Sequence, residues 1–201
     1  MDMLRDVADA LAMVAAVQGD LVADLRASEL DPNAPCSLPG WTRGHVLGHL
    51  ARNADSVVRR LEASAAGTVI SQYEGGAEGR VAEIEASRSR PYAALVTDVE
   101  ESAARVMTAA TLLADDAWSF ETLSVGGEGQ SALMVLKRRS REVVIHHTDL
   151  GIGFTPEQWP ATIIDELLAE CLPRLEERTA RAALASWLVD RSGAPPLAAW
   201  G

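Results

Sequence analysis

The stretch LPGWTRGHVLGHLARNAD (residues 38–55) combines the start of a helix with two histidines four positions apart. A Pro-Gly pair favours a turn, and Thr42 directly after it is a favoured N-cap residue. Trp41 can pack on Val46 as a hydrophobic staple, and apolar residues then follow at helical spacing. The pattern predicts a helix that begins at Thr42 and ends before Gly67.

Three more segments carry apolar residues at the spacing of one helical face: residues 3–28, 91–114 and 131–150. Together with the helix after Thr42 they predict an all-α fold, a four-helix bundle followed by a small C-terminal helical segment. The expected domains are a bundle at 1–155 and a short helical segment at 156–201.

The connections between these helices are less regular. Glycines and polar residues predict an irregular link at 68–80, followed by a short helix at 81–86. A second loop is expected at 115–130. The C-terminal segment is expected to hold a helix up to residue 178, interrupted or bent at Pro173, and one more short helix after it.

Composition excludes several classes of function. A net charge of -11 argues against a nucleic-acid partner, because phosphate binding needs a basic surface. No apolar run approaches the length of a membrane span, and the N-terminus has acidic residues where a signal peptide has a basic region. Two cysteines do not form a disulfide framework, so a cytoplasmic location is expected.

All four histidines lie in two stretches, and their spacing suggests a metal site. His45 and His49 share a helix face at positions i and i+4, as do Glu142 and His146, whereas His147 points about 100° away from His146. Bundle metal sites are built from such inward carboxylates and imidazoles on facing helices. The expected ligands are Glu142 and His146 with either His49 or His45, which suits zinc or another borderline divalent ion.

Three protein ligands would leave a position for water or substrate, which is typical of a catalytic site. The alternative is that the histidine pair and Glu142, which has Arg141 beside it, form an ordinary solvated helix face. Neither stretch contains HExxH, so the zinc-protease motif is absent.

The stretches LPGWTRGHVLGHLARNAD and RRSREVVIHHTDLG (138–151) together resemble the mycothiol-dependent maleylpyruvate isomerase family, which is part of the DinB-like metal-binding four-helix bundles. The resemblance covers GWTRxHxxxH in the second long helix and SREVxIHxxDLG in the fourth. It implies that His49, Glu142 and His146 bind the metal, and that His45 and His147 pack nearby.

Two arginines also match that family. Arg80 in YEGGAEGRVAEI is implied to bind substrate, and Arg191 in ASWLVDRSG is implied to be a catalytic residue that holds a carboxylate or stabilises an enolate. Asp190 stands where the family has a glycine before the second arginine. The resemblance also implies a larger mixed domain after the bundle, where this chain has only short helices and a tail.

The implied reaction uses mycothiol, the low-molecular-weight thiol of actinobacteria, as cosubstrate. A divalent metal stabilises the thiolate, which adds to the activated cis double bond of a maleylpyruvate-like substrate. Rotation and elimination then release the trans isomer and the thiol. The alternatives are a mycothiol S-transferase that conjugates the thiol to electrophiles, and a metal-binding bundle without turnover. The expected partners are small molecules only, and the sequence does not determine the oligomeric state.

Overall fold

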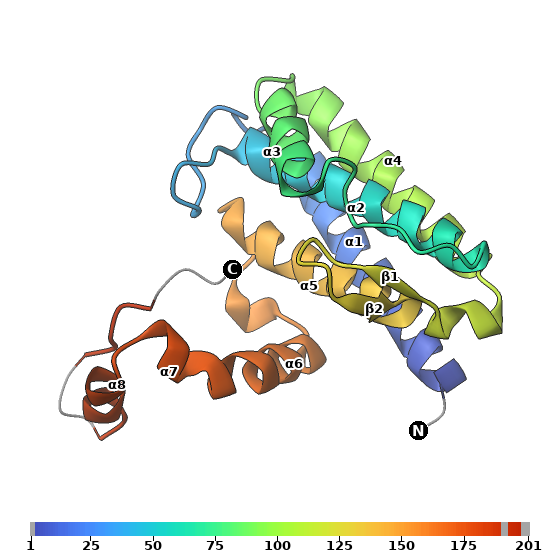
Figure 1. The fold of residues 1–201 in the computed structure, drawn as a ribbon. Helices are drawn as coiled ribbons and strands as arrows, with labels where there is room; N and C mark the ends of the chain where they lie inside the picture. Colours follow the sequence, from blue (N-terminus) through green and yellow to red (C-terminus); the bar gives the residue numbers. More distant parts are fainter. Residues whose placement is uncertain (1–2, 190–192, 198–201) are drawn as a thin grey trace. The chain divides into compact units, whose positions relative to one another are not determined.

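A computed structural model describes residues 3–189 and 193–197 of the chain. Four long helices, α1 (Met3–Arg26), α2 (Arg43–Ala65), α4 (Tyr92–Thr111) and α5 (Ala132–Asp149), run side by side (Figure 1). These helices confirm the all-α bundle that the sequence predicts.

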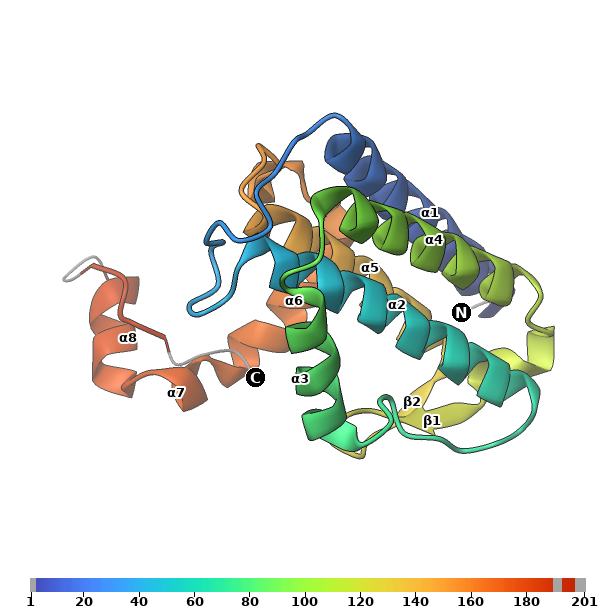
Figure 2. The same ribbon diagram turned by 90° about the horizontal axis from the view of Figure 1, so that it is seen from above.

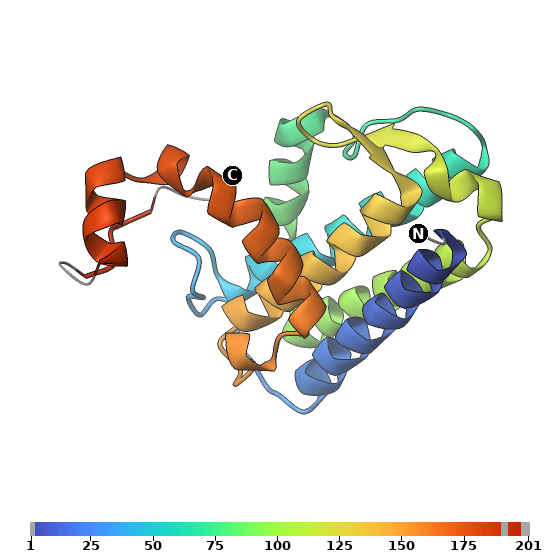
Figure 3. The same cartoon turned by 90° about the horizontal axis from the view of Figure 1, so that it is seen from below.

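The order of the helices around the bundle is α1, α4, α2, α5. Each helix contacts its two neighbours in this order, so α1 lies diagonally opposite α2. Figure 2 shows α4 between α1 and α2, and Figure 3 shows α1, in blue, alongside α5, in amber. The contact between α2 and α5 brings the two histidine-bearing helices face to face.

The buried faces follow the helical period and meet in one apolar core. On α1 the buried positions include Val7, Val14 and Leu21, each seven residues from the last. Burial of such side chains is the main stabilising contribution to a bundle, at roughly 1.5–3 kcal/mol for each large apolar residue. The core cluster includes buried residues from all four long helices, among them Val14, Leu61, Val106 and Leu136.

A buried arginine links three helices at the centre of the bundle. Arg139 on α5 is 1% exposed; its Nε donates to Gln18 Oε1 at 3.0 Å, and its Nη1 donates to Leu50 O at 2.8 Å and Asn53 Oδ1 at 2.9 Å. Burial lowers the pKa of Arg139 to about 10, so the guanidinium stays charged at neutral pH. It lies one helical turn before Glu142 on the same helix.

Helix α3 (Gly76–Ser87) packs closely against α2, and two glycines of α2 make this possible. A Cβ atom at Gly48 would lie 2.3 Å from Ser87 Cβ, and one at Gly44 would lie 2.3 Å from Arg88 O. The two glycines of GHVLGH therefore face α3, one helical turn apart. The sequence predicts a shorter helix here, at 81–86, because the glycines before it are poor helix formers.

The link at 115–130 is more ordered than the sequence predicts. It contains the 3₁₀ helix η1 (Asp115–Ser119) and an antiparallel hairpin of β1 (Glu121–Leu123) and β2 (Gly129–Ser131). Arg60 of α2 fixes the hairpin, because its Nε donates to Thr122 Oγ1 at 2.7 Å and its Nη2 donates to Gln130 Oε1 at 2.9 Å. Strands of three residues are too short to produce a period in the sequence.

Contacts divide the chain into two compact units, Met1–Pro156 and Glu157–Gly201. The second unit contains α6 (Ala161–Cys171), η3 (Leu172–Arg174), α7 (Leu175–Arg178) and α8 (Arg181–Leu188), after the 3₁₀ turn η2 (Pro156–Gln158). The α-helix is interrupted at Pro173, as the sequence predicts. Across the described part of the chain, no helix combines the length and the apolar character that crossing a bilayer requires.

Candidate metal centre

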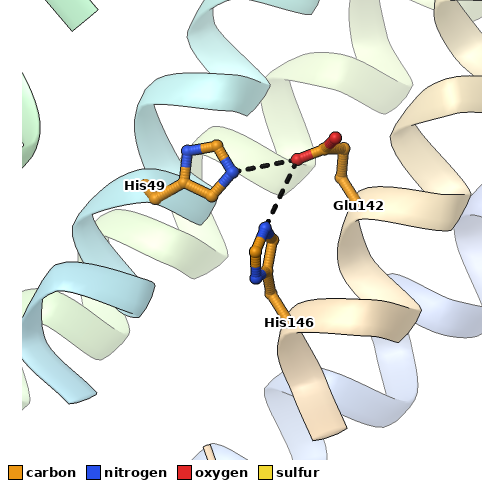
Figure 4. A group of neighbouring side chains, drawn as sticks. All are labelled: His49, Glu142 and His146. Carbon is orange, nitrogen blue, oxygen red and sulfur yellow. Dashed lines mark hydrogen bonds and ion pairs between the residues drawn. The ribbon is translucent and has the colours of Figure 1, made fainter. Parts of the chain in front are cut away.

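Three side chains from two helices converge between α2 and α5. His49 comes from α2, and Glu142 and His146 come from α5; one potential ligand atom of each lies within 4.8 Å of the other two. Glu142 Oε2 is 2.9 Å from His49 Nε2 and 3.6 Å from His146 Nε2. Figure 4 shows this single carboxylate oxygen between the two imidazoles.

The donor set suits a borderline divalent ion such as zinc. Zinc binds imidazole nitrogen at about 2.0–2.1 Å and carboxylate oxygen at about 2.0–2.2 Å, so the ligand atoms of a tetrahedral ion lie about 3.3 Å apart. The separations of 2.9 and 3.6 Å to Glu142 Oε2 are close to that value. Three protein ligands of this kind could hold such an ion and leave a coordination position open.

The protonation of the three groups follows from burial and mutual hydrogen bonds. Burial lowers the pKa of His49 to about 4, so its imidazole is neutral. Burial opposes ionisation of Glu142, but hydrogen bonds from His146 and His49 outweigh it and hold the pKa of this carboxyl well below its usual range. For His146 burial favours the neutral form, yet hydrogen bonds to Asp149 and Glu142 raise its pKa to about 9.

Asp149 orients His146, and the sequence reasoning missed it. Asp149 Oδ2 lies 2.8 Å from His146 Nδ1. The Asp149 carboxylate also accepts a hydrogen bond from the Ser37 hydroxyl, and the Asp149 backbone carbonyl accepts one from the Ser37 backbone N–H. A carboxylate on the remote nitrogen of a metal-binding histidine fixes its tautomer and strengthens it as a ligand. The i,i+3 spacing of His146 and Asp149 in the stretch HHTD was the feature of the sequence that could have identified this pair.

His45 lies outside this group because both of its ring nitrogens already have partners. The backbone N–H of Thr42 donates to His45 Nδ1 at 2.9 Å, and His45 Nε2 lies 3.2 Å from Glu85 Oε1. His45 thus occupies the N3 position of a capping box at the start of α2. Its spacing from His49 therefore reflects helix capping.

His147 faces away from the three converging side chains. Its Nε2 lies 3.1 Å from Asp24 Oδ2 on α1, and its ring stacks on Phe154 with centroids 4.0 Å apart. Its packing between α1 and the segment after α5 accounts for its presence beside His146.

An aromatic side chain borders the site. The ring of Trp41 lies 5.8 Å from that of His49 and 6.5 Å from that of His146, centroid to centroid, and stacks on the latter at 14°. The sequence reasoning assigned Trp41 only a packing role at the helix start. Cys36, in the same loop, donates to the carbonyl oxygens of Leu38 and Trp41, and burial raises the pKa of its thiol.

The two predicted arginines have different outcomes. Arg80 on α3 is half-buried beside the site, with its Nη2 3.4 Å from His49 Nδ1 and its guanidinium 6.0 Å from the centroid of the Tyr73 ring. Arg191 lies outside the described residues. The structure therefore brings Arg80 together with the three candidate ligands.

Comparisons with known proteins match the part of the chain that contains the three candidate ligands. Residues 11–151 match the family model of the mycothiol maleylpyruvate isomerase N-terminal domain. A crystal structure of the mycothiol-dependent maleylpyruvate isomerase is 30% identical, with a TM-score of 0.77, over 85% of this chain and 72% of that chain. A histidine-to-alanine mutant of that enzyme matches at 29% identity and a TM-score of 0.78, with the same coverage. No curated protein shows a significant match.

Proposed function

The chain belongs to the mycothiol maleylpyruvate isomerase family, and from this premise we propose that it is a metal- and mycothiol-dependent isomerase. Its substrate would carry an activated cis double bond, as maleylpyruvate does. The observation that supports this proposal best is the convergence of His49, Glu142 and His146 beside a half-buried arginine.

In this proposal His49, Glu142 and His146 hold a divalent ion, with zinc the best match to the donors. Such an ion supplies positive charge that favours the thiolate form of a bound thiol. Asp149 keeps the Nε2 atom of His146 directed at Glu142. Trp41 would line the site, because its ring lies beside both imidazoles.

Two arginines would bind or stabilise the negative charges of the substrate. Arg80 would bind a substrate carboxylate, because its guanidinium is half-buried next to His49. Arg191 would hold a second carboxylate or stabilise the enolate formed when the thiolate adds. Mycothiol is the nucleophile in this scheme, and Cys36, whose thiol pKa is raised by burial, has no covalent role.

A mycothiol S-transferase is the alternative function, since the same group would also serve conjugation of the thiol to an electrophile. The comparison covers 72% of the isomerase chain and does not distinguish isomerisation from transfer of the thiol. A metal-binding bundle without turnover is the least favoured alternative, since all three candidate ligands are present and together.

The product distinguishes these functions. The zinc-loaded protein is incubated with mycothiol and maleylpyruvate, and the isomerase proposal predicts the trans isomer with the thiol recovered. A stable thiol adduct would instead indicate the transferase, and a reaction independent of thiol would contradict both.

The candidate ligands are tested by metal content. His49→Ala should lose stoichiometric metal, whereas His45→Ala should keep it, because His45 is engaged in the helix cap. Loss of metal from only the His45 variant would refute the ligand set.

A further inference from the structure

The two candidate histidine ligands differ in what their remote ring nitrogens face. His146 Nδ1 faces the carboxylate of Asp149 at 2.8 Å, an acceptor of the kind usual behind a metal-binding imidazole. His49 Nδ1 instead faces Arg80 Nη2 at 3.4 Å, and a guanidinium has only N–H donors. The surroundings of His49 therefore do not favour the tautomer that a metal needs.

The contact with Arg80 and the binding of a metal require opposite tautomers of His49. A hydrogen bond from Arg80 needs the lone pair of Nδ1, which puts the ring hydrogen on Nε2, where it can donate to Glu142 at 2.9 Å. A metal on Nε2 needs the lone pair of that atom, which puts the hydrogen on Nδ1. Because a neutral imidazole has one N–H, the two interactions exclude each other.

Metal binding would leave two donors facing one another in a buried place. His49 is 2% exposed, so its Nδ1–H would need an acceptor, and a buried donor without one is costly. Arg80 is the polar partner of His49 Nδ1 in the described part of the chain. A carboxylate oxygen placed between them would accept from both donors.

We propose that loading of the metal converts the Arg80–His49 contact into a two-donor subsite that binds a carboxylate of the substrate. This inference rests on the proposed function and assigns an order to it, with metal before carboxylate. Arg80 stays in reach after the contact breaks, because its guanidinium lies over the Tyr73 ring. Helix α3 is itself held against α2 by the close approach of Ser87 to Gly48.

The first test is zinc affinity without any carboxylate, measured by competition with a chromophoric chelator. Arg80→Met should bind zinc about tenfold more tightly than the wild type, because the ion no longer has to break the contact and a nearby cation is gone. The control is Arg88→Met, which removes an exposed arginine paired with Glu85 and should change the affinity by less than about twofold. Unchanged or weaker zinc binding by Arg80→Met would overturn the inference.

The second test is calorimetric titration with maleate, a cis dicarboxylate, in the absence of thiol. The zinc-loaded wild type and Arg88→Met should bind maleate, whereas zinc-loaded Arg80→Met and the zinc-free wild type should bind it at least about tenfold more weakly. Equal binding of maleate by zinc-loaded Arg80→Met would show that the carboxylate goes elsewhere and would refute the subsite.

The two proposals fail differently. A wild-type protein that binds no zinc refutes the metal site of the proposed function and the subsite with it. Normal zinc binding, combined with an Arg80→Met variant that behaves as the wild type in both titrations, refutes the subsite alone.

Discussion

Removing the charge of Asp149 should weaken metal binding, and the chain contains a matched control for this test. Asp149 Oδ2 lies 2.8 Å from Nδ1 of the candidate ligand His146, and the aspartate side chain is 13% exposed. Asp24 Oδ2 lies 3.1 Å from Nε2 of the adjacent His147, which faces away from the site. Both aspartates face a ring nitrogen of a histidine on α5, but Asp24 is 50% exposed and only Asp149 faces a proposed ligand.

The expected loss follows from the role of the remote carboxylate. Groups that orient a metal-binding histidine typically contribute 10–100-fold to metal affinity, which is about 1.4–2.7 kcal/mol. Asp149→Asn keeps the shape and a carbonyl acceptor, so a loss of about tenfold is expected, and Asp149→Ala should approach about a hundredfold. Because Asp149 is largely buried, salt should screen this effect only weakly.

The assay is zinc competition near pH 8.5 for wild type, Asp149→Asn, Asp149→Ala and Asp24→Asn. A pH this high is needed because the proton on His146, whose pKa is raised to about 9, competes with the metal. Asp149 also stabilises that proton on His146. At lower pH its substitution would therefore weaken proton binding as well as metal binding, and the two effects would partly cancel in the measured zinc affinity. An Asp149→Asn affinity within about twofold of the wild type, or an equal loss in Asp24→Asn, would refute the reasoning.

Three further predictions concern stability. In the metal-free protein the pKa of His146 is raised to about 9, so its stabilising contribution is full below its unfolded pKa near 6.5 and is lost as pH rises through 9. The pKa of His49 is lowered to about 4, so this residue destabilises the fold as pH falls from about 6.5 to 4. Urea unfolding with chelator present should therefore show maximal stability near pH 6.5, with losses on the order of 3 kcal/mol on either side, and a flat profile would contradict both shifts. Gly48→Ala should cost about 1–3 kcal/mol because its Cβ would overlap a side chain of α3, whereas Gly19→Ala, with nothing within 4 Å, should stabilise α1 by up to about 1 kcal/mol; equal effects in thermal unfolding would disprove the packing argument. Arg139→Met removes three buried hydrogen bonds, so unfolding in urea should show a loss of about 2–4 kcal/mol, and a stable variant would count against this central role.

Spacing along a helix decided which residues share a face, but it left two candidate histidines on α2. His45 and His49 are equivalent in a periodic pattern, since both lie on one face four residues apart. The choice depends on where the helix begins. His45 is at N3, where its ring caps the backbone of Thr42, and one turn later His49 has no such partner and faces Glu142.

The residues that surround the candidate ligands are placed there by contacts between segments far apart in the chain. Ser37 reaches Asp149 and Arg80 reaches His49 only because loops and helices fold back on one another. The hairpin at 121–131 is likewise set by Arg60, a buried side chain of α2. No local period records such contacts, so the helical pattern could not predict them, and only the family resemblance pointed to Arg80.

The sequence by itself determined the four amphipathic helices and the helix faces on which the candidate ligands lie, and the family resemblance implied which three residues form the candidate ligand set. The helices and their faces are local properties, because the period of apolar residues and the i,i+4 spacing of polar ones follow from the geometry of a single helix. Only the tertiary structure decided the order α1, α4, α2, α5 around the bundle and the partner of each remote imidazole nitrogen. Those depend on side chains from separate helices meeting in one buried place, where each donor must find an acceptor.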